Sequence, residues 1–169
     1  MSLVTEDIRS KAEVHYGDEV CQTKFKELLR QVEMPDGLII VPDLEECGYL
    51  RETGFVWLKQ KKKSEYRFET TGRLASYAPE ITAYVEPRRI KKLSGVKSKE
   101  LMIWVTVNEI YIDDPASGKI TFKTTTGLSK SFPISAFDLK EIKKAKERKE
   151  AKEAKEGKEG KLVVVGEAK

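Results

Sequence analysis

Residues 98–134 read SKELMIWVTVNEIYIDD (98–114), PASGK (115–119) and ITFKTTTGLSKSFPI (120–134). A long run of β-branched and aromatic residues leads into a turn rich in Asp, Pro, Ser and Gly, and a second strand-like run follows. This order is typical of neighbouring antiparallel strands. The stretch therefore predicts a sheet, and the rest of the chain is interpreted outward from it.

The apolar positions of this stretch change phase part-way along. Alternate residues up to Val107 share one phase, whereas Ile110 and Ile112 belong to the other. One inserted residue reverses the facing of a strand, so we expect a β-bulge or bend near Asn108-Glu109. The segments at 101–107 (LMIWVTV) and 55–58 (FVWL) are apolar on both faces, which predicts strands covered on both sides.

A period of two continues through most of the chain after Leu38, and Gly, Pro, Asp and Ser mark the breaks. The candidate strands are 44–50, 55–60, 64–70, 73–77, 81–86, 99–112, 119–125 and 129–134. We therefore expect a mainly β (α+β) fold, an antiparallel, partly open barrel or sandwich of about seven or eight strands.

Helical patterns lie at the two ends. A first helix is expected from Thr5 to about Tyr16, and a second carries apolar residues at helical spacing up to Val32. A charged triplet repeat follows residue 145, without an apolar stripe, and predicts a helix that starts near Asp138 and frays. The expected organisation is 1–34 as a helical cover, 35–137 as the β domain and 138–169 as a charged low-complexity tail.

The net charge of +4 belongs to that tail. Residues 140–161 hold ten Lys or Arg and six Glu, and the remaining 22 basic and 22 acidic residues cancel. A neutral folded part without an RNP-like aromatic motif argues against nucleic acid as a partner. No secretory signal or run of 18 apolar residues is found, so we expect a cytoplasmic protein or one peripheral to a membrane.

Catalytic and metal-binding patterns are weak. The single histidine, His15, falls in a helical pattern and is interpreted as a surface residue; pairing with Cys21 would need two segments to fold together. Asp113 and Asp114 precede Pro, Ser and Gly, as turn residues do. No zinc, EF-hand, P-loop or dinucleotide motif occurs. We expect no cofactor, no metal and no enzyme activity.

Two basic clusters are the main candidates for binding. They have two interpretations: solvated loops whose lysines protect sheet edges, or a surface that meets anionic headgroups. The candidate ligand-binding residues are Trp57, Lys61, Lys62, Lys63, Arg88, Arg89, Lys91 and Lys92. Ten aromatic residues on the candidate strands and beside them are expected to fill the core or to line a cavity that opens near Arg88 or Lys61.

Several short motifs resemble a known plant family, Domain of Unknown Function 538. They are Pro35-Asp36-Gly37-Leu38, Thr53-Gly54-Phe55-Val56, Leu93-Ser94-Gly95-Val96-Lys97, Lys99-Glu100-Leu101, Trp104-Val105, Gly127-Leu128-Ser129-Lys130-Ser131-Phe132-Pro133 and Ser135-Ala136-Phe137. The similarity covers roughly residues 25–137.

The resemblance implies a plant protein with a partly open barrel-like domain, and it carries over no catalytic motif. Proposals for the family include a likeness to lipid-binding bactericidal/permeability-increasing proteins, an esterase-type, chlorophyll-hydrolysing activity and links to stress response. Many relatives look secreted; this chain shows no signal, and its lysines at 61–63 and its tail are departures from the pattern.

We therefore expect a non-enzymatic module that binds an amphipathic or lipid-like ligand, with a lipid-like small molecule or an anionic membrane surface as partner. The alternatives are an esterase-type hydrolase and a protein-interaction adaptor in plant stress response.

Overall fold

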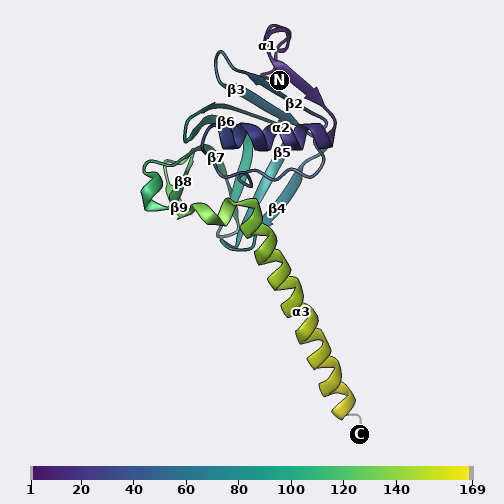
Figure 1. Cartoon of the computed structure of the whole chain (residues 1–169). Helices are drawn as coiled ribbons and strands as arrows, with labels where there is room; N and C mark the ends of the chain where they lie inside the picture. The colour runs from purple at the N-terminus through teal and green to yellow at the C-terminus, as the bar shows by residue number, and fades with distance from the viewer. Residues whose placement is uncertain (1, 168–169) are drawn as a thin grey trace.

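The fold is one open antiparallel sheet with one helix across a face and a long C-terminal helix that extends away from it (Figure 1). The computed structural model describes the backbone of residues 2–167 and the side chains of residues 2–157. The strands are β1 (Glu13–Tyr16), β2 (Glu46–Leu50), β3 (Phe55–Lys59), β4 (Ser64–Phe68), β5 (Arg73–Glu86), β6 (Arg89–Glu100), β7 (Ile103–Tyr111), β8 (Lys119–Thr124) and β9 (Ser129–Pro133). The helices are α1 (Glu6–Lys11), α2 (Asp18–Gln31) and α3 (Leu139–Glu167), with short 3₁₀ turns η1 (Pro115–Ser117) and η2 (Ile134–Phe137).

Eight of the nine strands follow the order β1-β2-β3-β5-β6-β7-β8-β9, and the ninth, β4, pairs with β5. The expected mainly β fold with helices at both ends is confirmed, as an open sheet and not a closed barrel. Helix α2 lies across one face of the sheet (Figure 1) and buries Cys21, Phe25, Leu28 and Leu29 against it. This stripe is the one that the helical spacing predicts.

The predicted first helix is too long. Helix α1 begins as expected, because the Thr5 side chain accepts a hydrogen bond from the Ile8 amide. It ends at Lys11, and residues 13–16 form the edge strand β1, which pairs with β2. The hydrogen bonds to β2 and the packing of Val14 on a second apolar cluster outweigh the local helical pattern.

Strands β5 and β6 are the largest departure from the predicted strands. The expected break at Pro79 is a register shift inside one long strand, between Tyr77 and Thr82. Gly95 lies opposite this shift with φ +86°, and a Cβ atom there would come within 2.4 Å of the Glu80 carbonyl oxygen. The bulge therefore accommodates both the proline and the close approach of the two backbones.

Strand β7 begins later than expected. The predicted strand 99–112 is interrupted by a two-residue turn at Leu101-Met102, which joins β6 to β7. The double coverage expected for 101–107 is wrong, because residues 101–103 are exposed, residues 104–106 are only partly buried and Val107 alone is buried. Residues 55–58 are buried as expected. The bend expected near Asn108-Glu109 is confirmed by a register shift between Val107 and Glu109.

A second, smaller apolar cluster surrounds Trp57, which is fully buried. The Trp57 indole donates a 2.7 Å hydrogen bond to Glu46, whose carboxylate also accepts two bonds from the Arg9 guanidinium, at 2.8 and 3.1 Å. Burial alone would raise the pKa of Glu46, but the bonds from Arg9 and Trp57 outweigh it and lower the pKa below its ordinary value.

Replacing Glu46 by Gln is expected to lower the free energy of unfolding by about 2 kcal/mol at neutral pH, since bonds to a charged group are lost. The folded-state pKa is depressed, so this contribution is present above the ordinary value of 4.5 and disappears as the pH falls through the folded pKa. Urea unfolding of both proteins at several pH values measures this. If the difference in unfolding free energy between the two proteins grew on acidification, this would contradict a lowered pKa of Glu46.

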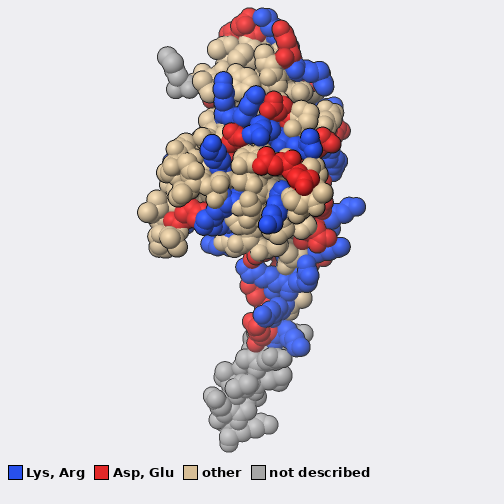
Figure 2. Space-filling model, turned by 90° about the vertical axis from the view of Figure 1, so that its left-hand side faces the viewer, with Lys and Arg blue, Asp and Glu red and all other residues tan. Residues whose placement is uncertain are grey.

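Helix α3 begins where the sequence predicts. The Asp138 carboxylate accepts hydrogen bonds from the Lys140 and Glu141 amides, and Ile142 packs on the core. The helix then extends away from the sheet, and its described part carries interspersed basic and acidic side chains (Figures 1 and 2). The expected fraying concerns residues 158–169, which lie outside the described side chains, and stays a prediction.

Candidate functional site

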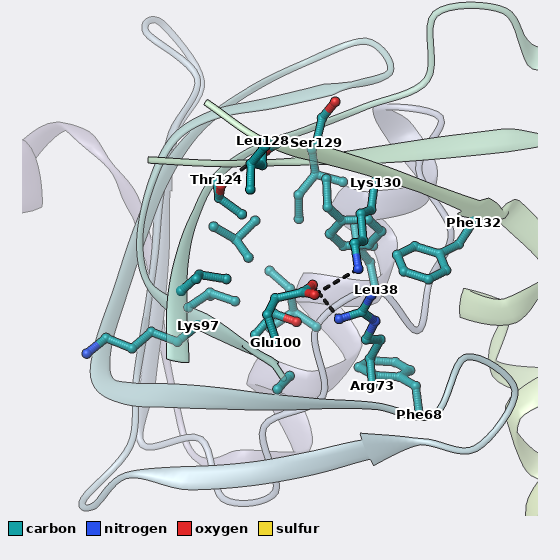
Figure 3. Close-up of a pocket in the computed structure, with 18 of the residues that line it drawn as sticks. Leu38, Phe68, Arg73, Lys97, Glu100, Thr124, Leu128, Ser129, Lys130 and Phe132 are labelled. Carbon is teal, nitrogen blue, oxygen red and sulfur yellow. Dashed lines mark hydrogen bonds and ion pairs between the residues drawn. The ribbon is translucent and has the colours of Figure 1, made fainter. Parts of the chain in front are cut away.

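An apolar pocket of about 280 Å³ lies between the strands β5 to β9 and the loop at Leu38-Ile39 (Figure 3). Its walls come mainly from alternate residues of neighbouring strands, such as Val96 and Ser98 of β6 and Val105 and Val107 of β7. Successive side chains of a strand point to opposite faces, so the pleat of the sheet sends one set into the pocket. The phase of apolar residues is therefore what builds this cavity.

Aromatic rings close the pocket on one side. Phe137 of η2 packs against Phe68 and Phe122, with ring centroids 5.1 Å apart in each pair, and against Phe132 at 6.3 Å. Tyr77 is fully buried, and its hydroxyl accepts a hydrogen bond from the Ile40 amide. These rings leave few polar groups facing the interior.

Three charged side chains converge at the pocket (Figure 3). The Glu100 carboxylate, at the end of β6, pairs with the Arg73 guanidinium and accepts a 2.8 Å hydrogen bond from the Lys130 ammonium. The bond from Arg73 is the main reason that the pKa of Glu100 lies below its ordinary value; Lys130 adds to this and burial opposes it. The site therefore holds two cations around one carboxylate.

The mouth of the pocket is apolar around this charged group. Leu101 and Leu128 line the pocket and are 95% and 73% exposed. The Lys130–Glu100 ion pair joins β9 to the end of β6, so the two hairpin ends that carry these leucines border the same opening.

The first group of predicted site residues lies elsewhere. Trp57 is enclosed in the second apolar cluster. Lys61, Lys62 and Lys63 are exposed between β3 and β4, and the Lys63 ammonium lies 5.9 Å from the ring centroid of Trp104. None of the four lines the pocket.

The second group surrounds the turn between β5 and β6, at the other end of β6 from Glu100. Arg89 pairs with Glu109, Lys91 lies 3.3 Å from Glu86, and Lys92 lies 5.4 Å from the Tyr84 ring. Arg88 lines a separate groove beside the start of α3. Neither Arg88 nor Lys61, the two places where the sequence led us to expect an entrance, lines the pocket. Binding by the eight predicted residues stays a prediction.

The residues of the charged group escaped the sequence reasoning because they are far apart in the chain. Arg73, Glu100 and Lys130 come from three strands, and each is an ordinary surface residue in its own segment. The signal that was present is alternation: Glu100 shares the phase of Val96 and Ser98, both of which line the pocket. A charged residue in an inward phase marks a pocket mouth or a buried ion pair.

The nucleophile and base candidates are not brought together. Ser98 and Ser129 line the pocket, whereas His15, the only histidine of the chain, lines a separate depression beside α2. The Cys21 thiol donates to the His15 carbonyl oxygen at 3.4 Å. Burial raises the pKa of Cys21 and raises that of Cys47 to about 12, so both thiols are kept protonated.

The described residues contain no cluster of three or more His, Cys, Asp or Glu side chains suited to a metal ion. In the same part of the chain, no helix has the length and apolar content needed to cross a bilayer.

Comparison with known proteins gives one match. The model of the family described as "Protein of unknown function, DUF538" matches residues 25–138, which include the C-terminal half of α2 and all strands of the pocket. No curated protein and no solved structure matches the chain. The match covers well over half of the 169 residues, and the chain therefore belongs to the DUF538 family.

Proposed function

We propose that this protein binds a single-chain amphiphile with an anionic headgroup, as a carrier or sensor without chemistry of its own. The observation that carries the proposal is an apolar pocket whose opening holds Arg73 and Lys130 beside Glu100. Apolar pockets with a few convergent polar groups are the usual form of small-molecule sites.

The apolar chain of such a ligand fits the interior. The lining is mostly apolar, so the interior offers water few hydrogen bonds, and an engineered apolar cavity of about 150 Å³ already binds benzene. The 280 Å³ here lies just below the roughly 300–1,000 Å³ of common ligand pockets. It suits one aliphatic chain, and it is too small for two.

The headgroup fits the charged residues. Arg and Lys both donate to carboxylates and phosphates, and Arg does so with two parallel bonds. Glu100 occupies these donors in the ligand-free protein, so it stands where a ligand carboxylate would bind. An incoming anion exchanges with Glu100 and leaves no cation unpaired.

Fluorescence titration with cis-parinaric acid, a fluorescent fatty acid, tests the proposal on the full chain. We expect saturable binding of one molecule per chain, reversed by lauric acid and reversed far less by dodecyltrimethylammonium, whose charge is opposite. Absence of saturable binding below the micellar concentration, or equal competition by the cationic amphiphile, would contradict it.

Replacing Glu100 by Gln is expected to tighten lauric acid binding by roughly tenfold, because the resident anion no longer competes for Arg73 and Lys130. Dodecanol, which has the same chain without the charge, serves as the control ligand and should bind with unchanged affinity. The dissociation constants of both ligands are measured by displacement of cis-parinaric acid. Weaker lauric acid binding by the variant, or an equal gain in affinity for dodecanol, would contradict the exchange of the ligand anion with Glu100.

A further inference from the structure

The turn between β6 and β7 exposes large apolar side chains beside the pocket. Leu101 is 95% exposed, Met102 83% and Ile103 66%, and Leu128 of the neighbouring hairpin is 73% exposed. Single exposed apolar residues are ordinary, but Leu101 and Leu128 line the same pocket, and Met102 and Ile103 directly follow Leu101 in the chain. Of the seven large apolar residues that are exposed in the described part of the chain, they are the majority.

The backbone of this turn is strained as well. Leu101 has φ +46° and Met102 has φ +75°, between the paired residues Glu100 and Ile103. A two-residue turn of this kind favours Asn-Gly, because only Gly, Asn and Asp enter the left-handed region at low cost. Leu and Met are therefore unfavourable here in both conformation and exposure. The folded chain gains nothing from them, which points to an external partner.

The surroundings of the turn indicate the chemistry of that partner. Lys97 and Lys99 lie on β6 just before the turn, and Lys130 lies across the opening. Trp104, three residues after Leu101, has the ammonium groups of Lys99 and Lys63 at 5.8 and 5.9 Å from its ring centroid. Exposed aliphatic residues flanked by Trp and Lys are the composition of protein segments at a membrane–water interface.

A protein partner is a poorer fit. A stable protein interface involves about 20–30 residues on each side, and the apolar surface here comprises four. A bilayer imposes no such requirement, since each inserted side chain is transferred from water to lipid independently.

We propose that the turn Leu101-Met102-Ile103, together with Leu128, inserts into a lipid bilayer that contains anionic phospholipids. This inference rests on the proposed function, because membrane contact serves the uptake of the ligand. An acyl chain can pass from the bilayer into the adjacent pocket without crossing water. The neighbouring lysines contact the phosphates, and Trp104 lies at the level of the headgroups.

The test uses the double variant Leu101→Asn/Met102→Gly in the full chain. It removes the two most exposed apolar side chains and supplies the residues that the turn geometry favours, so the fold should be as stable as the parent or more stable. We expect flotation with phosphatidylcholine vesicles containing phosphatidylserine to fall at least tenfold. Parent protein that fails to float, or a variant that floats like the parent, would overturn the proposal.

Arg88→Gly is the matched control. Arg88 also has a positive φ, +60°, in the turn at the opposite end of β6, and it belongs to the basic cluster that the sequence predicts as the headgroup contact. Its replacement should leave flotation within about twofold of the parent. A loss equal to that of the double variant would assign the membrane contact to the basic cluster and overturn the proposal.

Tryptophan fluorescence gives an independent readout. Trp57 is fully buried, so quenching by vesicles of brominated phosphatidylcholine mixed with phosphatidylserine reports on Trp104. We expect quenching in the parent and none in the double variant. Absence of quenching in floating parent protein would contradict insertion at this turn.

The vesicle assays test the membrane contact and the cis-parinaric acid titration tests ligand binding, so a failure of one proposal can be distinguished from a failure of the other. The single variant Met102→Gly, which leaves every residue that lines the pocket in place, should still bind the soluble fatty acid within about threefold of the parent. Loss of fatty acid binding by parent and variant alike would contradict the proposed function, whereas flotation would still decide the membrane contact.

Discussion

Replacing Gly48 by Ala is expected to lower the free energy of unfolding by about 3 kcal/mol, at the upper end of the usual cost of overpacking. A Cβ atom at Gly48 would come within 2.1 Å of the Trp57 ring, its cross-strand partner. The ring is fully buried and tied to Glu46 through its indole N–H, so it cannot move aside without losing that hydrogen bond.

Thermal unfolding of the parent and the variant measures the effect. For a chain of this size, 3 kcal/mol corresponds to a fall in Tm of roughly 6–12 °C. Gly157→Ala in α3 is the control, because a Cβ there meets nothing within 4 Å and Ala favours a helix. A Gly48→Ala protein as stable as the parent would show that the Trp57 cluster is less tightly packed than described.

Replacing Ala75 by Trp is expected to abolish fatty acid binding, with a loss of more than tenfold in affinity. Ala75 lies on β5 opposite Ser98, and both side chains face the pocket near the charged group. An indole at this position occupies space that the ligand chain needs. Displacement of cis-parinaric acid measures the affinity, and circular dichroism checks that the sheet is retained.

The matched control is Thr106→Trp. Thr106 lies on β7 between Val105 and Val107, both of which line the pocket, so its side chain points to the other face of the sheet. The same bulky residue there should leave affinity within about twofold of the parent. Equal losses in both variants, or full binding by Ala75→Trp, would place the ligand outside this pocket.

The strands that alternation predicts well are those with one buried face. β4 and β8 overlap their predicted ranges, and the bulge at Asn108 follows from a change of phase that is visible in the sequence. These features depend on neighbours in the chain, and the helical stripe of α2 does too.

The strands that the sequence missed depend on distant partners. β6 reads RIKKLSGVKSKE, which is typical of a loop, and it becomes a strand because β5 and β7 bond to both of its sides. β1 has a helical pattern and becomes a strand at the edge of β2. Cross-strand hydrogen bonds and packing override local preference in both cases.

The sequence indicated that an apolar cavity was one possible site, but it did not indicate where in the sheet such a cavity would lie. The aromatic strands left two roles open, filling the core or lining a cavity, and a cavity exists among Phe68, Phe122 and Phe132. Its position depends on which strands are neighbours, and that order was hidden by the loop-like sequence of β6. The exposed Leu101 and Met102 were also read as strand interior, because a turn without Gly, Asn or Asp gives no turn signal.

The measurement that tests the central claim most directly is a titration of ¹⁵N-labelled full-length protein with lauric acid, followed by two-dimensional NMR below the micellar concentration. We predict saturable shift changes at the amides of Leu38, Ser98, Val107 and Leu128, with little change at 61–63 and 88–92. Shifts confined to those two basic segments, or no saturable shifts at all, would contradict a ligand pocket at this end of the sheet.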